Sequence, residues 1–144
     1  MPRVRPNPRP SRATSHEPRA SFTIGCGIDV VDLPRFRRVL RRGGGAFLHR
    51  VFTAREVAYA RSRPRTTILH LAARFAAKEA VIKALAHVEL DGVVSMKQVE
   101  VVNDRSGRPH VHLRGMRSRG PLRVQVSLSH VRSVAVANAL VVRR

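Results

Sequence analysis

The sequence predicts an α+β fold in which three helices pack on a small, mainly antiparallel sheet. Before Gly92, apolar side chains recur mostly at helical spacing, whereas beyond it they recur at every second position. Helices followed by a run of strands joined by short turns are typical of an α+β domain. A chain of 144 residues with 43% hydrophobic residues is long enough for one such domain with a buried core.

The chain divides into an expected disordered tail, residues 1–21, and a domain, residues 22–144. The tail holds five of the nine prolines and five arginines against one acidic residue, a composition that cannot form a core. The domain opens with an apolar segment, Phe22–Val31, which predicts a buried strand. Gly25 and Gly27 interrupt this strand and indicate that something approaches its backbone closely.

Three helices are predicted next. The first begins at Leu33, with Asp32 as its N-cap, and ends at the glycine run 43–45. The second opens at the capping box Thr53–Glu56. The third, residues 66–87, is the longest and most regular. Its inner apolar stripe is expected to consist of Leu71, Ala72, Phe75, Ala76, Ile82 and Ala86.

In the half of the chain beyond Gly92, apolar residues recur at every second position, which predicts strands. Val99–Val102 and Pro109–Leu113 are expected to form a hairpin around the turn Asp104–Gly107. Leu122–Ser129 alternates between apolar and polar residues and predicts a half-buried strand. Ser133–Val142 is almost entirely apolar and predicts a central strand.

Charge limits the possible partners. The chain has 28 basic and 9 acidic residues, a formal net charge of +19, which attracts nucleic acid, nucleotide phosphates, anionic lipid or an acidic protein. Composition alone therefore favours a basic nucleic-acid-binding protein without catalysis. Two observations argue against nucleic acid: aromatic residues make up only 4%, and the charge is spread along the chain instead of gathering on one reading helix.

Cysteine content and hydropathy bear on location. The single cysteine, Cys26, excludes an internal disulfide framework and fits a reducing cytoplasm. The longest apolar stretch, Val134–Val142, is too short to cross a membrane. We therefore expect a cytoplasmic protein that does not insert into membranes.

Two carboxylates lack an obvious structural role. Glu79 falls on the expected apolar stripe, where a carboxylate is costly unless it is paired or bound to a metal. A bridge to Lys83, four residues on, would explain the spacing but not the placement. Asp29 stands within an apolar strand, and Asp32 is the better N-cap for the following helix.

Two isolated carboxylates in a cationic chain predict a site for a hard divalent ion. Mg²⁺ is commonly held by one or two carboxylates, together with waters and substrate phosphates. Arg74, Lys78 and Lys83 flank Glu79 and would supply positive charge for those phosphates. This arrangement indicates phosphoryl chemistry on a nucleotide-like substrate, and a Mg²⁺-dependent nucleotide hydrolase is an open alternative.

Five segments, in order along the chain, resemble the motifs of one family, the holo-[acyl-carrier-protein] synthases, which are 4′-phosphopantetheinyl transferases. The likeness extends from about Ile24 to Val142, and the Phe-Ala-Ala-Lys-Glu-Ala core of the third helix is its most specific part. The matching segments are Gly27–Phe36, Phe47–Thr53, Ala73–Ala84, Gly107–Pro109 and Val126–His130.

The resemblance implies a reaction and its catalytic residues. The enzyme would transfer 4′-phosphopantetheine from coenzyme A to a serine of an apo acyl carrier protein, of fatty-acid or polyketide synthesis, and release 3′,5′-ADP. Asp29 and Glu79 would hold Mg²⁺. Either Glu79 or a metal-bound water would take the proton of the serine, and Lys83 would stabilise the leaving phosphate.

The resemblance also implies binding residues and an assembly. Arg74, Lys78, Lys83 and His130 would bind the phosphates of coenzyme A, and Arg35 would meet the acidic recognition helix of the carrier protein. The family forms homotrimers with active sites between neighbouring subunits. The chain departs from the family after Lys83, where a glycine-rich loop is usual and the first glycine here is Gly92.

Overall fold

The computed structural model describes residues 22–88, 90, 92–118 and 120–144. The expected tail, residues 1–21, lies outside the described residues. The predicted α+β fold of three helices and small antiparallel sheets is confirmed. In chain order the elements are β1 (Thr23–Asp32), α1 (Leu33–Val51), α2 (Ala54–Arg61), α3 (Thr67–Leu85), the 3₁₀ turn η1 (Met96–Gln98), β2 (Val99–Asn103), β3 (Pro109–Leu113), β4 (Leu122–His130) and β5 (Val134–Arg143).

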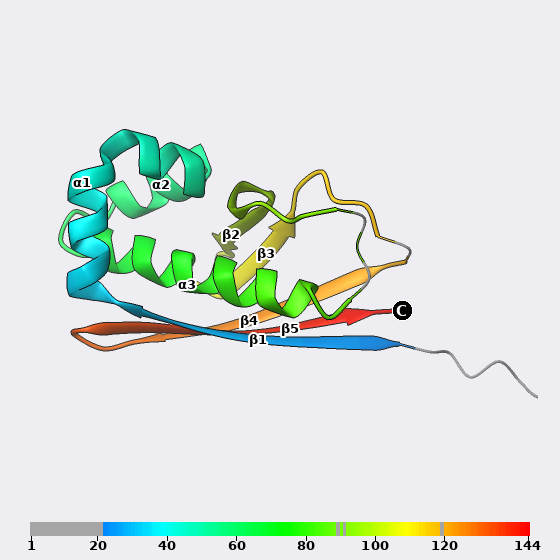
Figure 1. Ribbon diagram of the computed structural model, residues 1–144. Coiled ribbons are helices and arrows are strands. Elements are labelled where there is room, and N and C mark those ends of the chain that lie inside the picture. The colour runs from blue at the N-terminus through cyan, green and yellow to red at the C-terminus, as the bar shows by residue number, and fades with distance from the viewer. Residues whose placement is uncertain (1–21, 89, 91, 119) are drawn as a thin grey trace, which may run out of the picture.

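The strands form two antiparallel sheets. One has the order β1-β5-β4, and the other is the hairpin β2-β3. Figure 1 shows α3 lying along one face of the three-stranded sheet, with the hairpin on the same side and with α1 and α2 gathered at one end. The segment predicted as a central strand is β5, which lies between β1 and β4, so this prediction is confirmed.

The two glycines of β1 let α3 lie directly against the strand. A Cβ atom on Gly25 would overlap the carbonyl oxygen of Ala84, and one on Gly27 would overlap that of Ala80. The prediction that something approaches this backbone closely is therefore confirmed, and the approaching element is α3. This contact fixes the distance between the strand that carries Asp29 and the helix that carries Glu79.

The expectation that β1 is buried is wrong for one of its faces. Val31 and the two glycines face α3, but Ile24, Ile28 and Val30 are 52%, 58% and 61% exposed. Successive side chains of a strand point to opposite faces, and within the described part of the chain the helices cover only one of them. The other face of the sheet is therefore left with exposed apolar side chains.

Helix α1 begins where the sequence predicts. Asp32 Oδ1 accepts a hydrogen bond of 2.7 Å from the backbone N–H of Arg35, so the predicted N-cap is confirmed. The glycine run breaks the helix as predicted: Gly44 has non-helical backbone angles, φ +48° and ψ −138°, and a second helical segment then continues to Val51. The second segment brings Phe47 beside Phe36 and Phe75, with ring centroids 6.1 and 6.2 Å away.

The expected inner stripe of α3 is partly wrong. Leu71, Ala72 and Ala76 are buried as predicted, but Phe75, Glu79 and Ile82 are only partly buried, and Ala86 is exposed beyond the end of the helix. The helix is enclosed over most of its circumference, by the strands β1, β5 and β4 of the sheet and by α2, β2 and α1, so alanines at other positions form its buried faces. Glu79 therefore lies on the least enclosed side of α3, where a carboxylate keeps contact with solvent.

The remaining predictions of local structure hold. Asp104 Oδ1 accepts from the backbone N–H groups of Ser106 and Arg108, which closes the predicted hairpin turn. Thr53 and Glu56 form the predicted capping box at the start of α2.

Within the described residues, none of the helices is both long and apolar enough to cross a membrane.

Candidate functional site

Asp29 and Glu79 line the same cavity, which we call the carboxylate cavity. It has a volume of about 380 Å³, and its polar wall consists of Asp29, Asp32, Arg35 and Glu79. The rest of the wall is apolar and includes the rings of Phe36, Phe47 and Phe75. β1 supplies the first carboxylate and α3 the second, so the close packing of these two elements brings together residues that are distant in sequence.

Lys83 also belongs to this site. Its Nζ lies 2.7 Å from Asp29 Oδ1 and donates to the carbonyl oxygen of Ile28 at 3.0 Å. The hydrogen bond to Asp29 is the main reason why the pKa of Lys83 is raised, and the negative charges of Asp29 and Glu79 add to it. Among the described ion pairs, Lys83 therefore pairs with Asp29 and not, as its spacing would allow, with Glu79.

The donor set of this cavity fits Mg²⁺. Among the described residues, no group of three or more His, Cys, Asp or Glu side chains could hold a metal ion by itself. Mg²⁺ does not need such a group, because it commonly takes one or two protein carboxylates and completes its octahedron with waters and substrate phosphates. Asp29 and Glu79 in one open cavity match this pattern.

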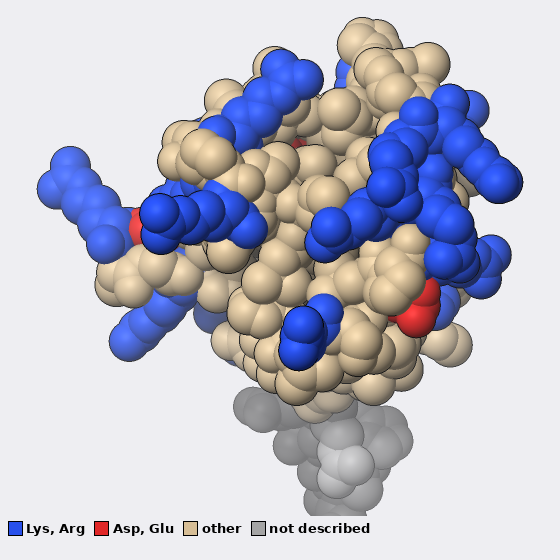
Figure 2. All heavy atoms as spheres, turned by 90° about the vertical axis from the view of Figure 1, so that its left-hand side faces the viewer, with Lys and Arg blue, Asp and Glu red and all other residues tan. Residues whose placement is uncertain are grey.

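Arg35 lies at the rim of the carboxylate cavity on the first turn of α1. Its side chain is exposed, as are those of the other arginines along this helix. Figure 2, which views the molecule from the end where α1 lies, shows many Lys and Arg side chains around this face and few acidic ones. The exposed arginines of α1 other than Arg35 are Arg37, Arg38, Arg41, Arg42 and Arg50.

His130 lies at a second cavity, which we call the basic cavity. Its volume is about 440 Å³, and Arg37, Arg65, Arg132 and His130 are among the residues that line it. The start of α3 forms another side, and the N-terminal end of a helix carries partial positive charge. The arrangement suits a phosphate group.

Arg74 lies in the N-terminal half of α3 and is only 3% exposed. It donates to Asn103 Oδ1 at 2.6 Å and to the carbonyl oxygen of His70 at 3.3 Å, and its guanidinium lies 3.9 Å from the centre of the Tyr59 ring. Its Nε has no hydrogen-bond partner among the described residues. Burial, followed by the charges of Arg74 and Arg63, lowers the pKa of His70.

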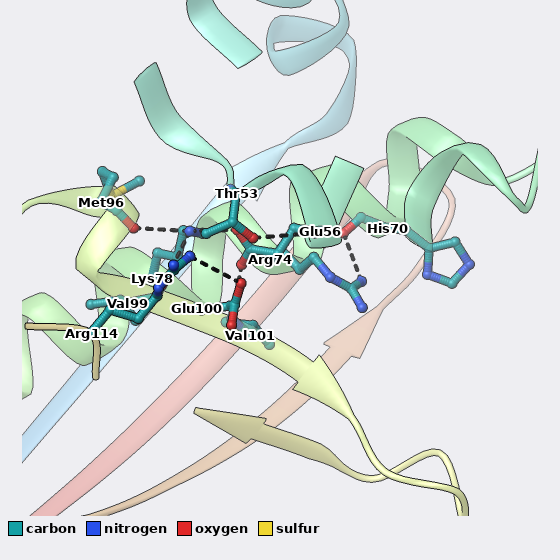
Figure 3. Close-up of polar contacts among 10 residues, drawn as sticks. All are labelled: Thr53, Glu56, His70, Arg74, Lys78, Met96, Val99, Glu100, Val101 and Arg114. Atoms are coloured by element: carbon teal, nitrogen blue, oxygen red, sulfur yellow. Dashed lines mark hydrogen bonds and ion pairs between the residues drawn. The ribbon is translucent and has the colours of Figure 1, made fainter. Parts of the chain in front are cut away.

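Lys78 does not join either cavity. Its side chain is fully buried, and its Nζ lies 2.7 Å from Glu56 Oε2 while it donates to the carbonyl oxygens of Met96 and Val99 (Figure 3). Burial lowers the pKa of Lys78, and the charge of Glu56 opposes this. The expectation that Lys78 binds a phosphate of coenzyme A does not fit this placement, because its donors are already used inside the protein.

Sequence reasoning missed two groups of residues. Glu56 was recognised only as part of a capping box, and no local pattern indicates that its carboxylate reaches Lys78. Arg37, Arg65 and Arg132 were three arginines among twenty-five. They come from α1, from the loop before α3 and from the turn after β4, so only the folded chain reveals that they share a cavity.

Known proteins include some that are similar to this chain in sequence and some that are similar in structure. Residues 25–139 match the 4′-phosphopantetheinyl transferase superfamily. A Geotalea daltonii protein named holo-[acyl-carrier-protein] synthase is 42% identical over 118 residues, which cover 78% of this chain and 93% of that protein. The Chronobacterium ammoniagenes ACPS–CoA complex has a TM-score of 0.69 at 30% identity and covers 84% of this chain and 98% of its own. A Bacillus anthracis holo-(acyl-carrier-protein) synthase in complex with CoA (3′,5′-ADP) has a TM-score of 0.68, also at 30% identity, with coverages of 86% and 100%.

Proposed function

The chain belongs to the 4′-phosphopantetheinyl transferase superfamily, and from this premise we propose that it transfers 4′-phosphopantetheine from coenzyme A to a serine of an apo acyl carrier protein. The products are the holo carrier protein and 3′,5′-ADP. The observation that carries this proposal is the carboxylate cavity of a family member, which Asp29 and Glu79 line and where Lys83 pairs with Asp29.

Asp29, Glu79 and Lys83 each have a chemical role in the proposed reaction. Asp29 and Glu79 would hold Mg²⁺, which would supply positive charge to neutralise the pyrophosphate of coenzyme A. Glu79 accepts the proton of the serine hydroxyl. The serine oxygen then bonds to the phosphorus that carries pantetheine, and the bond from this phosphorus to the bridging oxygen of 3′,5′-ADP breaks. Lys83 stabilises the charge that develops on the leaving phosphate.

We assign the basic cavity to the nucleotide part of coenzyme A. His130 and the guanidinium groups of Arg65 and Arg132 provide donors for a phosphate monoester, and Arg groups match phosphate geometry well. Arg74 supplies further positive charge from below the surface. Lys78 is left out of this assignment because of its buried ion pair.

The carrier protein docks, in this proposal, on the face of α1. Carrier proteins are acidic, and Arg35 lies at the rim of the cavity that holds the catalytic carboxylates. The surrounding positive charge would attract an acidic partner and speed its approach. A carrier docked here would present its serine to Glu79.

The face of the three-stranded sheet that no described helix covers supports assembly into a homotrimer. Ile24, Ile28 and Val30 are more than half exposed, and contiguous exposed apolar surface of this kind marks an interaction site. Neighbouring copies would cover this face and would bring one chain's basic cavity towards another chain's carboxylate cavity.

The free thiol of Cys26 fits the cytoplasm, the location that we propose.

Release of 3′,5′-ADP tests the proposed reaction against its rivals. Chromatography of a mixture of the protein, coenzyme A and Mg²⁺ should show 3′,5′-ADP only when an apo carrier protein is added. Release without carrier would indicate a nucleotide hydrolase instead. Absence of release with any carrier, together with steeply salt-dependent binding to DNA or RNA, would indicate a nucleic-acid-binding protein.

A further inference from the structure

Small residues form the closest contact between α3 and β1. Ala80 and Ala84 lie against Gly25 and Gly27 of β1, so neither side presents a large side chain at the closest contact. Small residues allow two backbones to approach closely. They do not interlock, however, so this contact fixes the separation of α3 and β1 better than it fixes the position of α3 along and around its own axis.

A buried polar cluster contacts α3 from another side. Lys78 Nζ is bound by Glu56 Oε2 of α2 at 2.7 Å, by the carbonyl oxygen of Met96 of η1 at 2.9 Å and by that of Val99 of β2 at 2.7 Å. Three different elements thus hold one atom of α3. Figure 3 shows these acceptors converging on the amino group.

The carboxylate of Glu56 is itself held in place. Its Oε2 accepts from the backbone N–H of Thr53, and its Oε1 accepts from that of Val101, both at 2.8 Å. The side chains of Glu56 and Lys78 are both 0% exposed. A buried ion pair of this kind contributes little net stability compared with apolar residues, but it can select one register between packed elements.

Lys78 directly precedes Glu79 on the helix. A shift of one position along an α-helix is a translation of about 1.5 Å and a rotation of about 100°, and Mg²⁺ tolerates neither at a ligand because it demands near-ideal octahedral geometry. We propose that the Glu56–Lys78 pair is the positioning device that sets the register of α3 and so holds Glu79 opposite Asp29. This inference rests on the proposed function, which makes the two carboxylates metal ligands.

The double variant Glu56→Gln/Lys78→Met tests this inference, since it removes both charges together. Binding of Mn²⁺ in the presence of coenzyme A, followed by electron paramagnetic resonance on the full chain, should weaken by about tenfold or more, as for loss of residues that orient metal ligands. Binding of coenzyme A without metal should stay within about twofold, because the basic cavity is unchanged. Unaltered Mn²⁺ affinity in the folded double variant would overturn the inference.

Leu71→Ala is the matched control. Leu71 is buried on the same helix, two turns before Glu79, so its truncation lowers stability without touching the ion pair. This variant should keep the Mn²⁺ affinity of the wild type while it is folded. If it loses as much affinity as the double variant, the effect is one of stability alone and the positioning role is wrong.

Should the double variant fail to fold, Glu56→Gln serves instead, and full Mn²⁺ affinity in that variant would equally overturn the inference.

Hydrogen exchange separates this inference from the proposed function. If Glu79→Gln binds Mn²⁺ as well as the wild type does, Glu79 is not a metal ligand and that part of the proposed function fails. The role of the ion pair in setting the register of α3 is then tested by hydrogen exchange of the backbone amides alone. Amides of residues 76–84 should exchange faster in the double variant than in Leu71→Ala of equal melting temperature. Equal exchange in the two variants would show that the ion pair does not hold this half of α3.

Discussion

The ammonium group of Lys83 lies 2.7 Å from Asp29 Oδ1 and 3.0 Å from the carbonyl oxygen of Ile28. A cation thus already sits beside one of the two proposed metal ligands. In the proposed reaction Lys83 serves the leaving phosphate, so binding of Mg²⁺ to Asp29 would release the ammonium group towards the substrate. The contact between Lys83 and Asp29 would then link metal binding to the placement of the Lys83 ammonium group, which stabilises the charge on the leaving phosphate.

The first prediction follows from this contact. Lys83→Met should raise the affinity of the protein alone for Mn²⁺ by about threefold, because a competing positive charge at a half-exposed site is removed. Turnover should fall in the same variant, since the leaving phosphate loses its cation. Metal titration without coenzyme A measures the first effect, and an unchanged or weaker affinity would mean that Lys83 does not compete with the metal.

The second prediction concerns the two carboxylates. Asp29→Ala and Glu79→Ala should each lower turnover by about a hundredfold or more, because each removes a proposed metal ligand. The free energy of unfolding should change by less than about 1 kcal/mol, since Asp29 takes part in a surface ion pair and Glu79 is only partly buried. Steady-state kinetics at saturating Mg²⁺ and thermal unfolding check both parts. Near wild-type turnover in either variant would refute the assignment.

The third prediction concerns docking of the carrier protein. Arg35→Glu should raise KM for the carrier by about tenfold while KM for coenzyme A changes little, because a charge at the rim of an interface acts on one partner. The backbone N–H of Arg35 that is capped by Asp32 is untouched by this change. Arg105→Glu, in the exposed hairpin turn, has the same change of charge and should leave both constants unaltered. Equal effects of Arg35→Glu on both substrates would place Arg35 at the nucleotide.

The fourth prediction concerns assembly. Ile28→Arg should reduce the molar mass measured by light scattering from that of a trimer to that of a monomer, because it places a charge in the proposed interface. Val93→Arg is the matched control, since Val93 is 97% exposed outside the three-stranded sheet. A wild-type protein that is fully active as a monodisperse monomer would rule out a site shared between subunits.

The fifth prediction concerns pH. Burial and the nearby charges of Arg74 and Arg63 lower the pKa of His70, so the folded protein keeps this imidazole neutral at pH values where the unfolded chain takes up a proton. Stability should therefore fall as pH drops below about 6.5, the value of an unperturbed histidine. Denaturant unfolding at pH 7 and pH 5 measures this fall, which should be smaller in His70→Gln. An identical fall in the variant would assign the effect to other groups.

Sequence patterns predicted the elements of this fold better than the surroundings of α3. Capping residues such as Asp32 and Thr53 act over a few positions, so they can be recognised locally, and both were correct. The burial of α3 depends on strands of both sheets and on the other two helices, and a period of 3.6 residues cannot indicate a helix enclosed on most sides. Glu79 was for that reason expected on a buried stripe and lies instead on the open side.

In the candidate site, too, the sequence motifs indicate the surroundings of some residues and not of others. Asp29, Glu79 and Lys83 belong to motifs that resemble a family, and the structure places all three together. Lys78 belongs to the same motif, yet its role depends on Glu56, whose carboxylate reaches it through the packing of α2 on α3. A motif shows which residue types occur together in sequence, but not whether a given side chain faces substrate or core.

The intact mass of an apo carrier protein tests the central claim most directly. After incubation with coenzyme A, Mg²⁺ and the wild-type protein, the carrier should gain the mass of one 4′-phosphopantetheine group. It should gain none when Glu79→Gln replaces the wild type or when the acceptor serine of the carrier is changed to alanine. A carrier that stays unmodified by the wild type, or that is modified equally well by Glu79→Gln, would contradict the account.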